Sequence, residues 1–476
     1  NKYIESVWWL LSELYKKNLI YKGYTIQPYS PMAGTGLSSH ELNQPGTYRD
    51  VMDTTIVAQF RAAEDSKTRV LALCGLSDLG ELPVDFLAWT TTPWTLPSNT
   101  ALTVGSKIDY VVVRTKNRYT DSEGFVILAE NLLEKQFANG PEHEVVGRCK
   151  GSDLVGMRYI QLINWAKPME RPEEAFRIIA GDFVTTEDGT GIVHTAPTFG
   201  ADDAMVAKSA GVPPMLVDDG TGHGVPLVDM QGRIREGYGP FSGRFVKNEY
   251  YNEGEAPEKS VDVEIAIDLK TSGQAFKVEK YSHSYPHCWR TDKPILYFPL
   301  DSWFVKATDA KERMTELNKT INWKPESTGT GRFGKWLENL NDWNLSRSRF
   351  WGIPIPIWRT EDGSEEVCIG SVEELAIRCE EAMEAGLMVS NPLDKFNAGD
   401  MSKENYELFD LHKHVVDEIV LKASDGSPMK READLIDVWF DSGSMPYAQW
   451  HYPFENKDKV DHEGAYPADF IAEGVD

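Results

Sequence analysis

The sequence predicts an α/β protein built from several domains. Its 476 residues are enough for about three domains of ordinary size. Residues 3–16 carry apolar side chains at helical spacing, whereas short β-branched and aromatic runs dominate from about Tyr48 onward. A hydrophobic share of 41% and a charged share of 26% are typical of a globular chain.

The elements follow in chain order. The helix at 3–16 precedes a short strand in "GYTIQPY" (23–29). Strands are then predicted at 84–92, 109–115, 124–130, 176–186 and 189–197. "GADDAMVAKSAG" (200–211) predicts a helix with two aspartates in its first turn, and the glycine- and aspartate-rich segment 217–232 predicts a loop.

Changes in amino-acid composition divide the chain into five segments. Residues 49–277 read as a β-rich domain, and aromatic residues return in 278–360. Residues 361–432 are acidic and helix-leaning, as in a small insertion, while 1–48 and 433–476 flank these regions. Because the chain opens on Asn1 and stops at Asp476 within a patterned segment, we expect it to be a piece of a longer protein.

Charge and cysteine content narrow the classes of protein. The 49 basic and 74 acidic side chains give a net charge of −25, which counts against a nucleic-acid partner without excluding a local basic patch. No apolar run approaches the roughly 20 residues of a membrane span. Five scattered cysteines without a C-x-x-C pair argue against a disulfide framework, and we expect a reducing, cytoplasmic setting.

Two motif matches lack their structural context. Gly329, Gly331 and Gly334 satisfy G-x-G-x-x-G, but no predicted strand precedes them, so a dinucleotide site is disfavoured. "VDDGTGHG" (217–224) lacks the spacing and the closing glutamate of a calcium loop.

The strongest constellation pairs "WTTTPWTLPSN" (89–99) with "GTGIVHTAPTFGADD" (189–203). The two segments offer hydroxyl, amide, imidazole and carboxylate groups, which suit a polar ligand bearing hydroxyls and an ammonium group. These groups belong to Thr90, Thr91, Thr92, Asn99, His194 and Asp203, and Gly189 and Gly191 flank Thr190 so that backbone can approach a ligand. No G-x-S-x-G or Cys/His nucleophile accompanies them. The structural alternative is a buried histidine beside strand threonines.

These two segments resemble the signature segments of the editing domain of isoleucyl-tRNA synthetases, which are class I aminoacyl-tRNA synthetases. The related valyl and leucyl enzymes typically carry arginine at the position of Thr92. The resemblance covers nearly the whole chain, because further segments at 3–24, 342–358, 437–443 and 469–476 are similar to the synthetase core. The HIGH and KMSKS segments of that family are absent, and we expect them to lie outside this chain.

The resemblance implies a β-rich, barrel-like editing domain with peripheral helices, inserted in a split Rossmann-type core. Binding alone discriminates poorly between isoleucine and valine, so such a domain hydrolyses mischarged Val-tRNA(Ile) with water. The implied partners are the acceptor end of tRNA(Ile) and valine or isoleucine as aminoacyl groups, with no membrane and a monomeric state. The parent enzyme would use ATP and Mg²⁺ to activate isoleucine and charge tRNA(Ile), a reaction not expected of this chain alone.

Roles for residues also follow from the resemblance. Asp203 would hold the substrate ammonium, the three threonines at 90–92 would line the pocket and position water, and His194 would exclude isoleucine by size. Asn99 would support the terminal adenosine or the threonines, and Trp94 would pack beneath them. The remaining substrate-binding residues implied are Gly189, Thr190 and Gly191 in the editing domain, Trp439 in the isoleucine pocket, and Glu473, Gly474 and Asp476 in the aminoacyl-adenylate site.

No zinc or other cofactor is expected in this chain. Many family members carry "CPRC" and "CWRC" where this chain reads Ser30-Pro31-Met32-Ala33 and Cys288-Trp289-Arg290-Thr291. Three of the four thiols are therefore missing.

Three other functions remain open from the sequence. The domain could have valyl or leucyl specificity, although Thr92 argues against it. Fourteen tryptophans and acid-bearing loops would also suit a carbohydrate-active hydrolase, but no convincing carboxylate pair is found. A non-catalytic tRNA-binding module is disfavoured by the acidic charge.

Overall fold

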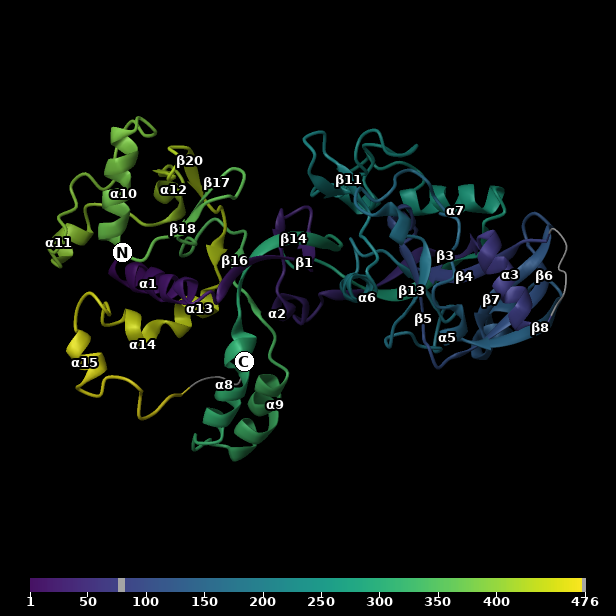
Figure 1. The fold of residues 1–476 in the computed structure, drawn as a ribbon, viewed down its shortest axis with the longest axis horizontal. Coiled ribbons are helices and arrows are strands. Elements are labelled where there is room, and N and C mark those ends of the chain that lie inside the picture. The colour runs from purple at the N-terminus through teal and green to yellow at the C-terminus, as the bar shows by residue number, and fades with distance from the viewer. Residues whose placement is uncertain (76–81, 473–476) are drawn as a thin grey trace. The chain divides into compact units, whose positions relative to one another are not determined.

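The computed structural model describes residues 1–75 and 82–472 and confirms a mixed α/β chain (Figure 1). It forms two compact units, one of Asn1–Tyr24 with Asp301–Asp476 and the other of Thr25–Leu300. The chain passes from one unit to the other in strands β1 (Ile20–Ser30) and β14 (Leu296–Val305), which belong to the four-stranded sheet β15-β14-β1-β2. Among the described residues, no helix is both long and apolar enough to cross a membrane.

The unit Thr25–Leu300 is built on a nine-stranded sheet. Its path runs β8-β6-β7-β4-β10-β5-β9, with β3 paired to β4 and β13 paired to β3. The strands are β3 (Tyr48–Arg61), β4 (Val84–Thr90), β5 (Ala101–Val104), β6 (Asp109–Lys116), β7 (Glu123–Ala129), β8 (His143–Lys150), β9 (Arg177–Ala180), β10 (Ile192–Thr195) and β13 (Ala275–Pro286). Strand β4 runs parallel to both β7 and β10.

Strand β4 is buried on both faces. Val84, Phe86 and Ala88 join the main core of the sheet, whereas Leu87 joins a second cluster with Val57. A strand covered on both sides needs apolar residues at successive positions rather than in alternation. This explains why "VDFLAWT" reads as an almost continuous apolar run.

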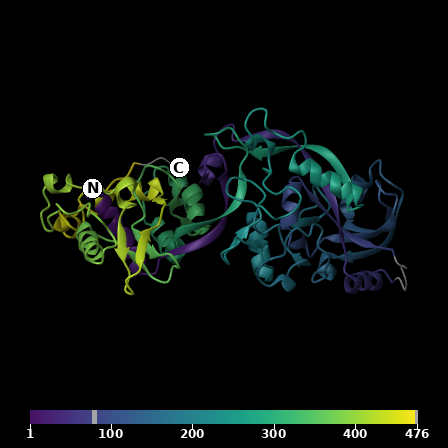
Figure 2. The ribbon, with the colours of Figure 1, turned by 90° about the horizontal axis from the view of Figure 1, so that it is seen from above.

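Helices and short 3₁₀ turns accompany this sheet. Helix α7 (Val261–Thr271) packs against β3 and β13 and also contacts the 3₁₀ turn η1 (Pro93–Ser98) (Figures 1 and 2). Helix α6 (Ala201–Ala210) follows β10 and ends at Gly211, whose φ of 72° gives the left-handed cap expected after a helix. The other helices are α2 (Ser39–Leu42), α3 (Glu64–Leu73), α4 (Leu133–Phe137) and α5 (Gly151–Leu154).

The unit of Asn1–Tyr24 and Asp301–Asp476 has its own core. Helix α1 (Lys2–Lys16) confirms the predicted amphipathic helix and buries Val7, Trp8 and Leu11. The indole of Trp8 donates to the Pro354 carbonyl at 2.9 Å and packs edge-on against Trp358. A sheet of order β18-β17-β20-β19 lies in the same unit, formed by β17 (Ile357–Thr360), β18 (Glu366–Cys368), β19 (Val420–Lys422) and β20 (Pro428–Arg431).

The remaining strands of this unit are short, and the remaining helices range from four to 13 residues. The strands are β15 (Trp343–Asn344), β16 (Ser346–Arg347) and β21 (Leu435–Ile436), of which β16 and β21 pair with each other. The helices are α8 (Lys311–Asn318), α9 (Phe333–Glu338), α10 (Val372–Glu384), α11 (Lys403–Tyr406), α12 (Lys413–Val416), α13 (Val438–Gly443), α14 (Met445–Ala448) and α15 (Lys457–Asp461).

Two sequence-based assignments were wrong in part. The predicted loop at 217–232 contains a small hairpin of β11 (Leu216–Asp218) and β12 (Gly224–Pro226). The glycines and aspartates that suggested a loop instead form its turn, where Asp218 accepts from the backbone N–H groups of Gly220 and Gly222. The strand predicted at 176–186 ends at Ala180.

Gly191 provides a test of how tightly the sheet is packed. Its φ is +72°, and a Cβ built there would lie 2.4 Å from the Cβ of Ala129. We expect Gly191→Ala to lower the free energy of unfolding by about 2–5 kcal/mol, because backbone strain and overpacking add. Gly211 has the same φ of +72° but no neighbour closer than 3.9 Å, so Gly211→Ala should cost only about 1–2 kcal/mol. Denaturant unfolding followed by tryptophan fluorescence measures both, and equal losses would contradict the packing argument.

Candidate active site at the ends of β4 and β10

A run of hydroxyl groups, which we call the threonine loop (residues 90–95), follows strand β4. Thr90 Oγ1 accepts a hydrogen bond of 3.1 Å from the backbone N–H of Thr92 and lies 3.4 Å from the Thr92 hydroxyl. Pro93 opens η1, where a proline is tolerated because the first N–H of a helix has no partner. Among the described residues, the half-buried Thr91 hydroxyl has no hydrogen-bond partner.

The buried imidazole of His194 on β10 is bonded through both ring nitrogens. The Asn99 side-chain amide donates to Nδ1 at 2.9 Å, so Nδ1 is an acceptor. Nε2 lies 3.0 Å from the Thr95 hydroxyl, which itself donates to the Thr92 carbonyl at 2.8 Å. The proton therefore belongs on Nε2, and the ring joins β10 to the threonine loop.

Burial of His194 lowers its pKa to about 3. The imidazole is therefore neutral at physiological pH, because no anionic side chain among the described residues compensates its removal from water. Since neither ring nitrogen is free, this conformation offers the histidine as a fixed wall of the site rather than as a base.

Sequence reasoning missed two members of this network. The Tyr159 hydroxyl donates to Asn99 Oδ1 at 2.6 Å, which fixes the amide orientation that His194 requires. Thr95 lies inside the segment that was singled out, and its position three residues after Thr92 on η1 was the available signal. Tyr159 lies in a segment without any motif, so nothing in the sequence marked it.

The carboxylate of Asp203, in the first turn of α6, accepts a hydrogen bond of 2.8 Å from the backbone N–H of Ala196. Burial raises the pKa of Asp203 to about 6, and this N–H only partly opposes the rise. No cation pairs with Asp203 among the residues that the structure describes.

Sheet topology brings these groups to one edge. Strands β4 and β10 are parallel neighbours in the register Trp89 to Val193. Their carboxyl ends therefore lie at the same edge, where Thr90–Thr92 follow one strand and Ala196, bonded to Asp203, follows the other.

The other expected residues of this unit make close protein contacts. The Thr190 hydroxyl is buried and donates to the Leu87 carbonyl at 2.6 Å. A Cβ at Gly189 would lie 3.0 Å from the Trp89 ring, so the close approach that this glycine permits is to a side chain of the same sheet. Trp94, within the threonine loop, is buried against Phe199 at a ring distance of 5.0 Å.

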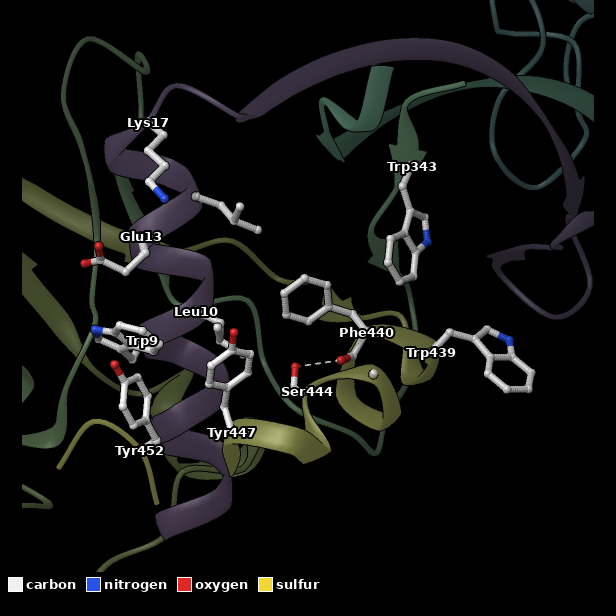
Figure 3. Close-up of a pocket in the computed structure, with 12 residues that line it drawn as sticks. Trp9, Leu10, Glu13, Lys17, Trp343, Trp439, Phe440, Ser444, Tyr447 and Tyr452 are labelled. Atoms are coloured by element: carbon white, nitrogen blue, oxygen red, sulfur yellow. Dashed lines mark hydrogen bonds between the residues drawn. The ribbon is translucent and has the colours of Figure 1, made fainter. Parts of the chain in front are cut away.

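Trp439 belongs to the other unit. It is 59% exposed and lines a cavity of about 480 Å³ between α1 and the helices α13 and α14 (Figure 3). Leu10 of α1 faces Phe440 and Tyr447 across this cavity, and Trp9 packs edge-on against Tyr452. Glu473, Gly474 and Asp476 lie outside the described residues.

Many members of the resembled family carry two cysteine pairs at positions 30–33 and 288–291. The residues that this chain has there do not fit a four-ligand metal site. Cys288 packs with Ala33, Leu37 and Ile295 in a small apolar cluster. Burial alone would raise the pKa of the Cys288 thiol, but hydrogen bonds from the Ser30 hydroxyl and nearby backbone N–H groups lower it overall. Within the described ranges, no group of three His, Cys, Asp or Glu side chains is arranged to hold a metal ion.

The protonation state of His194 can be measured. We expect its ring to remain the neutral Nε2–H tautomer from pH 8 to pH 4, because its pKa is about 3. In the unfolded chain the imidazole would take up a second proton near pH 6.5, whereas in the folded chain it does so only near pH 3. His194 therefore lowers the free energy of unfolding as the pH falls from about 6.5 toward 3. Nitrogen-15 NMR of the histidine rings measures the tautomer, and a His194→Asn variant identifies the signal. A ring that titrates near pH 6 would contradict the network.

Comparisons with known proteins agree on one family. A family model described as tRNA synthetases class I (I, L, M and V) matches residues 1–476. The chain is 58% identical to the isoleucine–tRNA ligase of Bacteroides fragilis and 42% identical to that of Clostridium tetani. All of this chain is aligned in both cases, but only 44% and 39% of the relatives, so the chain spans less than half of their length.

Solved structures give weaker matches. The Plasmodium knowlesi cytosolic leucyl-tRNA synthetase editing domain is 14% identical with a TM-score of 0.34, covering 49% of this chain and 98% of that domain. The assignment therefore rests on the sequence comparisons, which place this chain in the class I tRNA synthetase family of the isoleucyl, leucyl, methionyl and valyl enzymes.

Proposed function

We propose that the unit Thr25–Leu300 is the editing domain of an isoleucine–tRNA ligase and hydrolyses valine from mischarged tRNA(Ile). The observation that carries this proposal is the single sheet edge at which the threonine loop and the unpaired carboxylate of Asp203 lie. The isoleucine–tRNA ligases to which the chain is similar support the choice of amino acid. The family assignment leaves no support for a carbohydrate-active hydrolase.

The substrate's ammonium group would complete the site. Asp203 is half-buried, lacks a cation among the described residues, and has a pKa raised by its removal from water. An ammonium group placed there would form a charge-assisted hydrogen bond and hold the carboxylate in its ionised form. This contact would fix the α-amino end of the aminoacyl group.

Hydrolysis then needs only a positioned water molecule. The water oxygen forms a bond to the ester carbonyl carbon, and the bond to the ribose oxygen breaks. The products are free valine and the terminal ribose hydroxyl, which receives a proton. Hydroxyls of Thr90, Thr91 and Thr92 would orient the water, and no acyl-enzyme intermediate is required because an ester is already activated.

Size selection would rest on rigidity. A neutral His194 fixed through both nitrogens cannot turn aside to admit a larger side chain. It would therefore exclude isoleucine, which is one methylene larger than valine. Asn99 would act by holding this ring, and Trp94 by packing beneath the loop.

The second unit would belong to a split synthetase core into which the barrel-like editing domain is inserted. There, Trp439 would form a wall of the isoleucine pocket, with its cavity as the place for the side chain. ATP and Mg²⁺ would serve isoleucine activation in a longer cytoplasmic protein and take part in no step described above.

Adjacent aspartates allow a matched test of the site. We expect Asp203→Asn to slow the release of valine from Val-tRNA(Ile) about 10- to 100-fold, because a hydrogen bond to a charged group contributes about 1.5–3 kcal/mol. Asp202 is exposed on the same turn, so Asp202→Asn should leave the rate within about threefold of the unmodified chain.

The measurement is release of labelled valine at saturating enzyme, with Ile-tRNA(Ile) as the second substrate. Release of valine but not isoleucine supports the proposal. Equal rates in the two variants would remove Asp203 from the site, and no release by the unmodified chain would overturn the proposed function for this chain.

A further inference from the structure

A buried ion pair lies directly beside the threonine loop. Asp262, in the first turn of α7, and Lys247 are each 5% exposed. Asp262 Oδ1 accepts a hydrogen bond of 2.8 Å from the backbone N–H of Trp94, the second residue of η1. Asp262 Oδ2 lies 3.6 Å from Lys247 Nζ.

Other charged and aromatic groups surround Lys247. Its ammonium lies 3.5 Å from Asp53 Oδ2 and 4.9 Å from the centre of the Tyr285 ring, and His283 Nε2 contacts the same Asp53 oxygen at 3.1 Å. Burial alone would lower the pKa of Lys247, but the charge of Asp262 raises it overall. Burial raises the pKa of Asp262, and the charge of Lys247 opposes the rise.

Such a pair needs a reason, because two buried charges seldom stabilise a fold more than apolar residues of similar volume would. The first turn of η1 explains the buried pair, because it needs a hydrogen-bond acceptor. The first N–H groups of a helix have no partner within it, and usually the N-cap side chain accepts from the second or third.

The N-cap residue of η1 is Thr92, a residue type suited to capping, yet its hydroxyl makes no cap bond. That hydroxyl lies near Thr90 Oγ1 instead, at 3.4 Å. Asp262 supplies the missing cap from α7. The Thr92 hydroxyl is therefore released from its local structural role.

We propose that Asp262, held in place by Lys247, is a positioning residue of the deacylation site: it caps η1 in place of Thr92 and so leaves the Thr92 hydroxyl for the water and substrate. This inference rests on the proposed function. The acceptor oxygen of Asp262 caps η1. The positive charge of Lys247 offsets the energetic cost of burying that carboxylate.

Two double variants separate the cap from the ion pair. Asp262→Asn with Lys247→Met removes both charges but keeps an acceptor oxygen for the Trp94 N–H. Asp262→Leu with Lys247→Met removes both charges and the acceptor, with a side chain of similar size. Thermal unfolding of both variants shows whether each still folds.

The first readout needs no substrate. Hydrogen exchange of the free protein, followed by mass spectrometry over residues 93–99, should be at least tenfold faster in the Leu/Met variant than in the Asn/Met variant. The second readout is the single-turnover release of valine. At saturating enzyme, the Asn/Met variant should stay within about threefold of the unmodified chain, whereas the Leu/Met variant should be at least tenfold slower.

The outcomes separate the two proposals. Equal release by both folded variants, while the unmodified chain releases valine, overturns the role of Asp262 and leaves the proposed function standing. Unequal exchange without valine release by any variant, the unmodified chain included, overturns the proposed function while confirming that Asp262 anchors η1. Equal hydrogen-exchange rates over residues 93–99 in the two double variants would contradict the proposal that Asp262 caps η1.

Discussion

The geometry of the candidate site depends on one neutral imidazole. His194 accepts from Asn99 and donates to Thr95, so it links a sheet strand to the threonine loop through two bonds of opposite direction. Only the neutral ring has both a donor and an acceptor nitrogen. Burial therefore has a structural consequence here: by keeping the ring uncharged, it preserves the hydrogen-bond direction that the loop requires.

Two carboxylates near this loop, the half-buried Asp203 and the buried Asp262, have different partners. Both have a pKa raised to about 6 by removal from water. Asp262 has Lys247 as a partner, whereas Asp203 has a single backbone N–H and no cation among the described residues. A carboxylate that is largely removed from water and lacks a cation is costly in the free protein, and a cationic ligand relieves that cost when it binds. This contrast supports the proposed roles of Asp262 as a structural residue and of Asp203 as a ligand-binding residue.

The sheet gives these groups their fixed spacing. The segment 189–191 is held by the Tyr110 hydroxyl on the Gly191 carbonyl at 2.6 Å and by the Gln136 amide on the Gly189 carbonyl at 2.6 Å. Its two glycines adopt positive φ and pack against Trp89 and Ala129. The strand bearing His194 therefore starts from a rigid turn, and its end reaches the site with little freedom to shift.

The sequence by itself determined the local elements and the two signature segments. Periodicity predicted α1, β4, β10 and α6 because each is a local pattern of apolar residues. It failed at 217–232, since the glycine and aspartate that favour a loop also favour a tight hairpin turn. Thr90, Asn99, His194 and Asp203 stood out because they lie in two short runs rich in polar groups.

Only the tertiary structure decided how these groups are used. Tyr159, Lys247 and Asp262 come from segments without a motif. Tyr159 and Asp262 reach the site through hydrogen bonds across 60 or more residues of sequence, and Lys247 contacts Asp262. The protonation of His194 likewise depends on burial and on partners contributed by other elements. Local sequence cannot encode such facts, because hydrogen-bond direction and desolvation are set by whatever the fold places alongside a residue.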